Sequence, residues 1–200
     1  MPRTDADVID ALVGITPGSP LDAIRARRPE ARAHAQATYR AVFAPEAPGN
    51  VTAQERSAVG GFVAGLHGAT PITVYYAARL AESGASTALR EAVDAAIAEA
   101  RTIGPYGRYP AGPLSREDTA GSSYRVGPAI RRTLGPRLAA AFEHVHMLVF
   151  HPRDAAPAAL QALLDAGWST TDIVTLSQIV AFMSFQIRLV TGLRILAGRP

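Results

Sequence analysis

Three of the five histidines in this chain of 200 residues lie within eight positions, at His144, His146 and His151. Imidazoles this close in sequence could bind a metal ion or exchange protons near neutral pH. Residues two apart on a helix point to opposite sides, however, and the three- or four-residue spacing of helical zinc sites is absent. We therefore expect no metal site. One of these histidines should face the core or a pocket, with His146 as the candidate for ligand binding, and residues 151–154 should form a capped turn between helices.

A single arginine interrupts the most apolar part of the chain. Arg188 follows Ser184 and Phe185 by about one helical turn. A guanidinium in apolar surroundings is rarely left unpaired. Two interpretations remain open, namely a buried ion pair with Glu55 or Glu143, and an anchor for an anionic ligand.

The chain contains no cysteine. This excludes disulfide frameworks, thiolate metal sites and every mechanism that needs a cysteine nucleophile or a redox dithiol. Hydrophobic residues make up 48% of the chain and charged residues 18%, which is typical of a folded domain with a substantial core and not of a disordered chain.

All 20 basic residues are arginines, and the formal net charge is +3. The tightest cluster, within residues 25–32, lies among alanines with no neighbouring aromatic side chain, so we expect a solvated helix face and no nucleic-acid binding. The first residues lack the apolar segment of a signal peptide. The longest uncharged run, 173–187, is too short to span a bilayer, which takes about 20 residues. We expect no membrane association and a cytoplasmic location.

Caps, prolines and glycines divide the chain into helices, and no segment alternates as a β-strand would. We therefore predict an all-α fold. Thr4 is the predicted cap of the first helix, and Gly14 its end. Further helices are expected over residues 19–28, 29–43, 52–67, 71–84, 86–104, from about 128, 136–149, 154–167 and 169–196.

Two similar capping boxes, at 52–55 and 169–172, each precede a long apolar helix. They indicate either two related helical halves, 15–104 and 128–200, or only the general likeness of core helices. Between the halves, residues 105–127 are rich in Gly, Pro and Tyr and show no periodicity. Such a long loop is typical of a functional or partner-covering segment.

Residues 52–76, TAQERSAVGGFVAGLHGATPITVYY, resemble the alkylhydroperoxidase AhpD-like superfamily, which includes the carboxymuconolactone decarboxylases and the peroxidase-related proteins. The Glu-Arg pair, the apolar helix and the Leu-x-Gly break match the stretch before that family's reactive motif. Residues 167–188 look like the second half of its longer members. The resemblance covers about a quarter of the chain and implies a single AhpD-like helical bundle over residues 1–200.

The resemblance also locates the missing cysteines. Peroxidases of this family carry Cys-x-x-Cys directly after the glycine, and these two positions fall on Ala69 and Ile72. A thiol peroxidase needs one thiolate to attack the peroxide and a second thiol to resolve the intermediate. The chain should therefore not be a thiol peroxidase.

The other redox groups of the family are also replaced. The family histidine falls on Tyr76, or on Tyr75 if the second residue of a histidine pair is meant, and the family glutamate falls on Ser57, with Glu55 two residues away. His67 lies at the corner before the lost motif. If the fold is as expected, these five side chains surround one small cavity.

Decarboxylases of the superfamily do not rely on a redox dithiol, so acid–base chemistry is still possible. One hypothesis is a non-redox enzyme or binder of a small carbonyl or carboxylate compound that needs no cofactor. Its candidate catalytic residues are His67, Tyr76, Glu55 and Ser57, and its candidate binding residues are Arg188, Tyr75 and His146.

The alternative is a non-catalytic structural or partner-binding protein with a filled pocket. In that case His67 caps its helix, and Tyr75 and Tyr76 pack with their hydroxyls reaching water. Family members commonly form dimers, trimers or hexamers, so under either hypothesis we expect a homo-oligomer.

Overall fold

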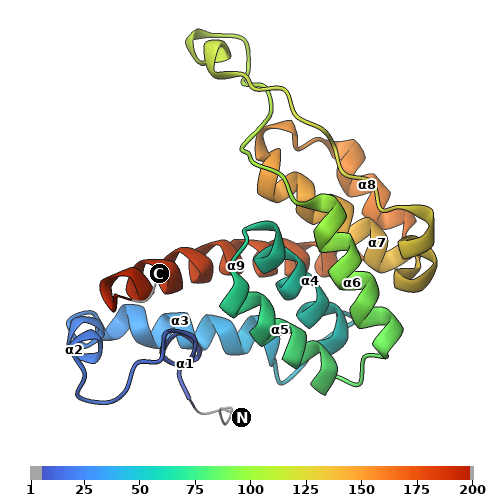
Figure 1. The fold of residues 1–200 in the computed structure, drawn as a ribbon. Helices are drawn as coiled ribbons and strands as arrows, with labels where there is room; N and C mark the ends of the chain where they lie inside the picture. The colour runs from blue at the N-terminus through green and yellow to red at the C-terminus, as the bar shows by residue number, and fades with distance from the viewer. Residues whose placement is uncertain (1–5, 199–200) are drawn as a thin grey trace.

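The computed structural model describes residues 6–198. Within them the chain forms nine α-helices, two short 3₁₀-helices and no strand, which confirms the all-α prediction. Figure 1 shows their arrangement. In chain order they are α1 (Val8–Val13), α2 (Pro20–Ala26), α3 (Pro29–Phe43), α4 (Ala53–Leu66), α5 (Thr70–Glu82), α6 (Thr87–Ala100), η1 (Pro113–Glu117), α7 (Pro128–Phe150), η2 (Pro152–Asp154), α8 (Pro157–Asp165) and α9 (Thr170–Leu196).

Helix α4 is the centre of the core. All its residues from Arg56 to Leu66 are buried, and it contacts α5, α6, α7 and α9. Helix α9 is long enough to contact α1 and α3 as well as α7 and α8, so it joins the two ends of the molecule (Figure 1). Helices α4 and α9 follow the two capping boxes and contact each other. That residues 15–104 and 128–200 form two related helical halves stays a prediction.

Both capping boxes form as the sequence predicts. The Thr52 hydroxyl accepts the backbone N–H of Glu55 at 3.1 Å, and the Glu55 carboxylate accepts the N–H of Thr52 at 2.8 Å. At α9 the Ser169 hydroxyl accepts the N–H of Asp172 at 3.2 Å, and Asp172 accepts the N–H of Ser169 at 3.1 Å. Free N–H groups at both helix starts are thereby satisfied.

Helix boundaries differ from the prediction at two places. The predicted cap Thr4 lies outside the described residues, and the side chain of Asp7 caps α1. Helix α6 ends at Ala100, four residues before Gly104. The expected restart at Pro136 is confirmed, because Gly135 has φ 76° and breaks the helical backbone inside α7. Only glycine adopts this conformation readily.

The arginine cluster near the N-terminus is not simply a solvated helix face. Arg25 is 7% exposed and forms ion pairs with Asp7, at 2.7 Å, and with Asp10. Arg32 pairs with Asp10 and, at 2.8 Å, with Asp22. The expectation is wrong for Arg25 because Asp7, the N-cap of α1, and Asp10, within α1, pair with it across the fold.

Residues 104–127 form an arm that projects from the helical body (Figure 1). The arm contains η1, and the pair Gly107 and Thr119 bridges its two limbs through backbone hydrogen bonds of 2.8 and 3.2 Å. At its base the guanidinium of Arg153 lies 4.2 Å from the centroid of the Tyr109 ring. Contacts to η2 therefore fasten the base of the arm.

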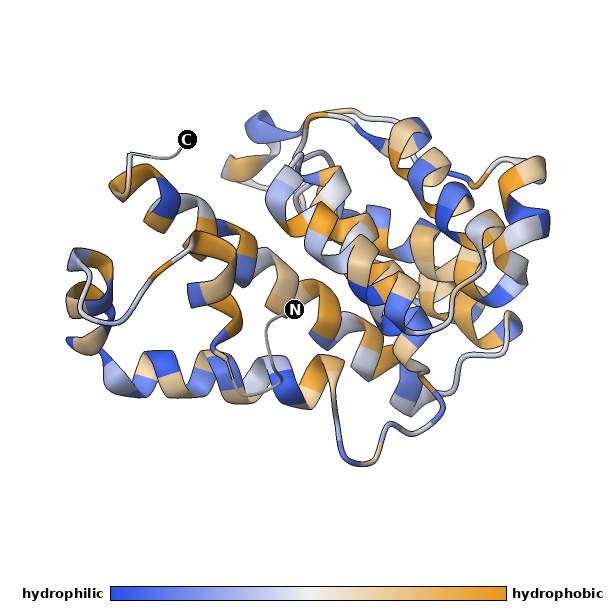
Figure 2. Cartoon of the chain, turned by 60° about the horizontal axis from the view of Figure 1, so that its bottom comes forward, coloured by the Kyte–Doolittle hydropathy of each residue, from blue (hydrophilic) through white to orange (hydrophobic). Residues whose placement is uncertain are grey.

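Helix α9 is the one described helix that is long and apolar enough to cross a membrane, judged by length and composition alone. Half of its most apolar window is buried inside the protein. Figure 2 shows hydrophobic residues along the helix that leads to the C-terminus, interrupted by hydrophilic ones. Core helices of soluble proteins have the same character, so this is weak evidence for a span.

Candidate functional site

Glu55 has a structural partner. Its carboxylate, besides capping α4, accepts a hydrogen bond from Nε of Arg137 at 2.7 Å, and its side chain is 15% exposed. The guanidinium of Arg137 also lies 4.0 Å from the centroid of the Trp168 ring. The geometry explains Glu55 as a helix cap and ion-pair partner.

Arg188 does not form the predicted buried ion pair. Its side chain is exposed and donates to the backbone carbonyl of Ser184 at 2.8 Å, one turn earlier on α9. Glu55 pairs with Arg137, and Glu143 pairs with Arg125 and Arg131. The ion-pair interpretation was wrong because the helix turns this position to the surface. A role for Arg188 as an anion anchor stays a prediction.

Tyr76 is fully buried, and its hydroxyl donates to Oε1 of Gln186 at 2.9 Å. Burial raises the pKa of Tyr76 well above its ordinary value. The hydroxyl of Tyr75 lies 2.6 Å from that of Tyr39, and burial with this contact raises its pKa as well. Neither tyrosine is poised to ionise near neutral pH. The expectation that the hydroxyls reach water is wrong for Tyr76, whose partner is a buried side chain.

The structure does not bring the five family-derived residues around one cavity. Ser57 and Tyr76 share a cavity of about 20 Å³, the size of a single water molecule. Glu55 and His67 lie near opposite ends of α4, about 18 Å apart along the helix axis. Tyr75 faces Tyr39 instead. A straight helix cannot place both of its ends at one small site.

His67 follows the last residue of α4, at the corner that also holds Ala69 and Ile72, the two positions to which the sequence resemblance assigns the cysteines. Its side chain is exposed, although partial desolvation and the nearby Arg188 lower its pKa. A separate cavity of about 440 Å³ lies between residues 68–72 and residues 190–195 of α9. Ala69 and Ile72 line it, and neither side chain can act as a thiol.

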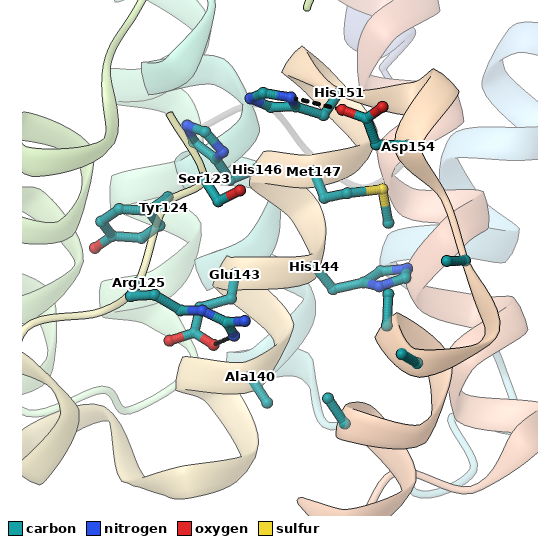
Figure 3. Close-up of a pocket in the computed structure, with 14 residues that line it drawn as sticks. Ser123, Tyr124, Arg125, Ala140, Glu143, His144, His146, Met147, His151 and Asp154 are labelled. Atoms are coloured by element: carbon teal, nitrogen blue, oxygen red, sulfur yellow. Dashed lines mark hydrogen bonds and ion pairs between the residues drawn. The ribbon is translucent and has the colours of Figure 1, made fainter. Parts of the chain in front are cut away.

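All three residues of the histidine cluster line a different cavity, which we call the histidine cavity (Figure 3). Its volume is about 320 Å³, near the lower end for small-molecule sites. Residues 123–125 form one wall, and residues 154–162 form the opposite wall with four alanines. The floor is α7, which contributes Ala140, Glu143, His144, His146 and Met147, together with His151 directly after the helix.

His144 is 6% exposed and lines this cavity, yet its Nδ1 atom has no hydrogen-bond partner among the described residues. Figure 3 shows its ring directed toward α8. Burial lowers the pKa of His144, so the imidazole is neutral at neutral pH. A buried ring nitrogen without a partner is costly, because its hydrogen bond to water is lost on folding.

His146 lies on the other flank of α7, as the spacing predicts (Figure 3). It is 3% exposed, and its ring centroid lies 5.4 Å from Tyr124 and 4.9 Å from Phe150. Burial and, to a smaller extent, the nearby His151 lower the pKa of His146 to about 4, whereas a hydrogen bond with the backbone of Ala100 acts to raise it. It borders the histidine cavity and a more polar hollow of about 430 Å³ on its other side.

Glu143 fastens the wall of the histidine cavity to its floor. The carboxylate accepts a hydrogen bond from Arg125 at 2.8 Å and from the backbone N–H of Val126 at 3.0 Å, and it also pairs with Arg131. The Arg125 side chain is 77% exposed, so part of its guanidinium is accessible at the edge of the cavity.

The predicted turn at 151–154 is confirmed as η2, but no side chain caps it; instead His151 Nδ1 lies 3.1 Å from Asp154 Oδ2. No three His, Asp or Glu side chains come together in a geometry that could hold a metal within residues 6–198. The sequence does contain a signal for the floor of the cavity, because positions 140, 143, 144, 147 and 151 share one face of a helix. The walls come from segments that no local pattern connects to it.

The chain matches no family model, no curated protein and no solved structure.

Proposed function

We propose that this protein binds a small carbonyl or carboxylate compound in the histidine cavity. The observation that carries the proposal is the buried Nδ1 atom of His144, which lines the cavity and has no partner within residues 6–198. A ligand oxygen or hydroxyl would supply the missing hydrogen bond. The proposal moves the site from the corner at His67 to α7.

The lining supports a ligand with one polar end and a small apolar body. Neutral His144 offers either an N–H donor to a carbonyl or a lone pair that acts as a general base. Arg125 offers positive charge at the edge. The alanines of the 154–162 wall and Met147 form the apolar surface between these groups. A neutral imidazole also suits proton transfer near neutral pH, as a non-redox enzyme requires.

Histidine-selective NMR tests this function. The probes are pyruvate, which carries both a carboxylate and a carbonyl, isobutyrate, which carries only the carboxylate, and acetone, which carries only the carbonyl. We expect saturable shifts of the His144 ring resonances at millimolar concentrations. In His144→Phe the shifts that the same probes cause at the other cavity histidines, His146 and His151, should be lost. The matched control His34→Gln changes an exposed histidine of α3, whose side chain is 79% exposed, and should bind as the wild type does.

Two results would contradict the proposal. One is the absence of any saturable shift at His144 with all three probes. The other is an unchanged response of the remaining cavity residues in His144→Phe, since the ligand would then bind without this side chain.

We also propose that the chain is a cysteine-free member of the AhpD-like superfamily. Support comes from the capping box, the apolar helix α4 and the Leu-x-Gly corner. Without a dithiol it should reduce no peroxide; turnover of peroxide by the purified protein without added metal or haem would contradict this.

A second candidate function, a partner-binding homo-oligomer, is supported by exposed apolar side chains on α5 and α9. Val74 is 63% exposed, Val174 57% and Phe185 46%. Phe185 also lines an apolar groove of about 770 Å³ between α3 and α9. Light scattering that finds only a 21.0 kDa monomer at micromolar concentration would refute a homo-oligomer.

A cytoplasmic location remains part of the proposal. It is supported by the burial of half of the apolar window of α9 and by the contacts of this helix with α1, α3, α4, α7 and α8. A membrane fraction that retains the protein through a high-salt wash would contradict it.

A further inference from the structure

Both ring nitrogens of His151 meet hydrogen-bond acceptors. Nδ1 lies 3.1 Å from Oδ2 of Asp154, and Nε2 lies 3.0 Å from the backbone carbonyl of Ser122. A carbonyl accepts only, and an ionised carboxylate accepts only. A neutral imidazole has a single N–H, so it can satisfy one of these two contacts. The imidazolium, with two N–H groups, satisfies both.

We infer that His151 is held as an imidazolium, and that its two N–H groups clamp the 104–127 arm against the histidine cavity, so that loss of one proton releases the arm. The idea that this clamp regulates a ligand site rests on the proposed function. The clamp itself rests only on the contacts of His151.

The clamp joins both limbs of the arm to η2. The outgoing limb of the arm precedes η1, and the returning limb follows it. Ser122 belongs to the returning limb and directly precedes the cavity wall at 123–125. Asp154, the other acceptor, also accepts the backbone N–H of Arg108 from the outgoing limb at 3.1 Å. The backbone of the outgoing limb passes so close to Asp154 that a Cβ atom at Gly107 would lie 3.0 Å from the Asp154 carboxylate. One ion pair thus positions the start and the end of the arm.

The charged surroundings favour the imidazolium. His151 is 5% exposed, and a buried cation needs a paired anion, which Asp154 supplies. The backbone N–H of Arg108 and the bond to His151 lower the pKa of Asp154 and keep it ionised. His146, whose ring centroid is 6.0 Å away on α7, is neutral and does not compete for the charge.

The other groups that face His151 are few. Tyr106, from the outgoing limb, lies with its ring centroid 5.0 Å from that of His151. The cation of Arg153, next to Asp154 on η2, is turned to Tyr109 and to the carbonyls of Gly107 and Glu117. Arg153 thus holds the outgoing limb, and the Asp154 carboxylate is the anion that contacts the His151 ring.

Deprotonation breaks the clamp at one acceptor. If Nδ1 keeps its proton toward Asp154, the Nε2 lone pair faces the lone pairs of the Ser122 carbonyl, and this contact becomes repulsive. The carbonyl then gains by turning to water, and the 122–125 wall moves with it. Loss of this proton with rising pH should therefore open the wall.

Two measurements on the ligand-free, full-length protein test the clamp. Nitrogen-15 NMR reports directly whether one or both ring nitrogens of His151 carry a proton. Amide hydrogen exchange, expressed as protection relative to the unstructured chain, reports opening at Arg108 and Val126, whose N–H groups bond Asp154 and Glu143. We expect two protonated nitrogens at low pH, and protection that falls by up to roughly tenfold per pH unit once His151 titrates.

The control amide is that of Asp172 in the capping box of α9, whose protection should not change with the state of His151. In His151→Gln only one end of the side-chain amide, the NH2 group, can donate, and its oxygen cannot donate to the second acceptor, so protection at Arg108 should be low and independent of pH. A His151 spectrum with one unprotonated nitrogen at every pH from 5 to 8, or pH-independent protection in the wild type, would overturn the inference. Because no ligand is present, these results are independent of whether pyruvate shifts His144.

Discussion

The guanidinium of Arg137 donates a hydrogen bond from Nε to Oε1 of Glu55 across 82 positions of sequence, at 2.7 Å. Glu55 is the acid of the first capping box. Another nitrogen of the same guanidinium lies 3.3 Å from Oδ2 of Asp172, the acid of the second capping box. One arginine therefore ties together the starts of α4 and α9, the two helices that contribute the most buried residues.

Replacement of Arg137 by methionine should destabilise the fold by about 2 to 4 kcal/mol, because two partly buried carboxylates lose their common partner. The Asp172 side chain is only 6% exposed and that of Glu55 15% exposed. Arg137→Lys should recover less than half of the loss, since lysine cannot bond both acids in the planar geometry of arginine or stack on Trp168 in the same way. Urea denaturation at pH 7 measures both variants.

The matched control is Arg79→Met, which removes the ion pair of Arg79 with Glu82, where both side chains are about a third exposed. Its cost should stay below about 1 kcal/mol. Equal losses in the two methionine variants would show that Arg137 contributes no more than a surface ion pair.

Most of the fold could be predicted because its signals are local. A Thr or Ser followed three residues later by an acid satisfies free N–H groups of the same helix turn, so 52–55 and 169–172 identify helix starts without any knowledge of distant contacts. The break at Gly135 is equally local. Arg137 carries no such signal, since its partners lie 82 and 35 positions away.

The candidate site was harder to predict for the same reason. The histidine cluster drew attention to 144–151, and the helical direction rule correctly separated His144 from His146. The sequence could not show that residues 123–125 and 154–162 close the space over α7, because these walls depend on how a long arm and α8 pack. The family-derived residues failed as a group, because a rigid α4 keeps Glu55 and His67 apart.

Acid should destabilise the protein between about pH 6.5 and pH 4, in part through His146. Its folded-state pKa of about 4 lies below the ordinary value of 6.5, so in this range the unfolded chain binds more protons than the folded one. Stability is therefore present above pH 6.5 and lost as the pH falls, by up to about 1.4 kcal/mol per pH unit for this group. Denaturation midpoints at half-unit pH steps measure the slope.

His146→Phe should flatten this part of the profile, and the exposed His34→Gln should leave it unchanged. Some slope will remain in His146→Phe, because burial also lowers the pKa of His144. An identical slope in the wild type and in His146→Phe would mean that His146 is not buried in its neutral form.

Tyr76→Phe should cost about 1 to 3 kcal/mol, because it removes the donor to a fully buried amide. The Nε2 atom of Gln186 already has no partner among the described residues, so the variant leaves both polar ends of this side chain unsatisfied. The double variant Tyr76→Phe with Gln186→Leu should regain part of the loss, since both polar partners become apolar. Thermal unfolding of Tyr76→Phe, Gln186→Leu and the double variant completes the cycle. A catalytic or binding role for Tyr76 would instead appear as a loss of the probe response at His144 in a folded Tyr76→Phe protein.

Adjacent glycines of α4 should respond in opposite directions to alanine. At Gly60 a Cβ atom would lie 2.8 Å from Cδ1 of Tyr76 and 3.0 Å from Cε1 of Phe43, so Gly60→Ala must displace two packed rings and should cost about 1 to 3 kcal/mol. At Gly61 the nearest atom is Cβ of Tyr76 at 3.7 Å, an ordinary contact. Gly61→Ala should therefore be neutral or stabilise the protein by up to about 1 kcal/mol, because alanine loses less backbone entropy in a helix than glycine does. Equal destabilisation by both variants, measured by urea denaturation, would show that α4 does not approach α5 at Gly60 as closely as the ring contacts require.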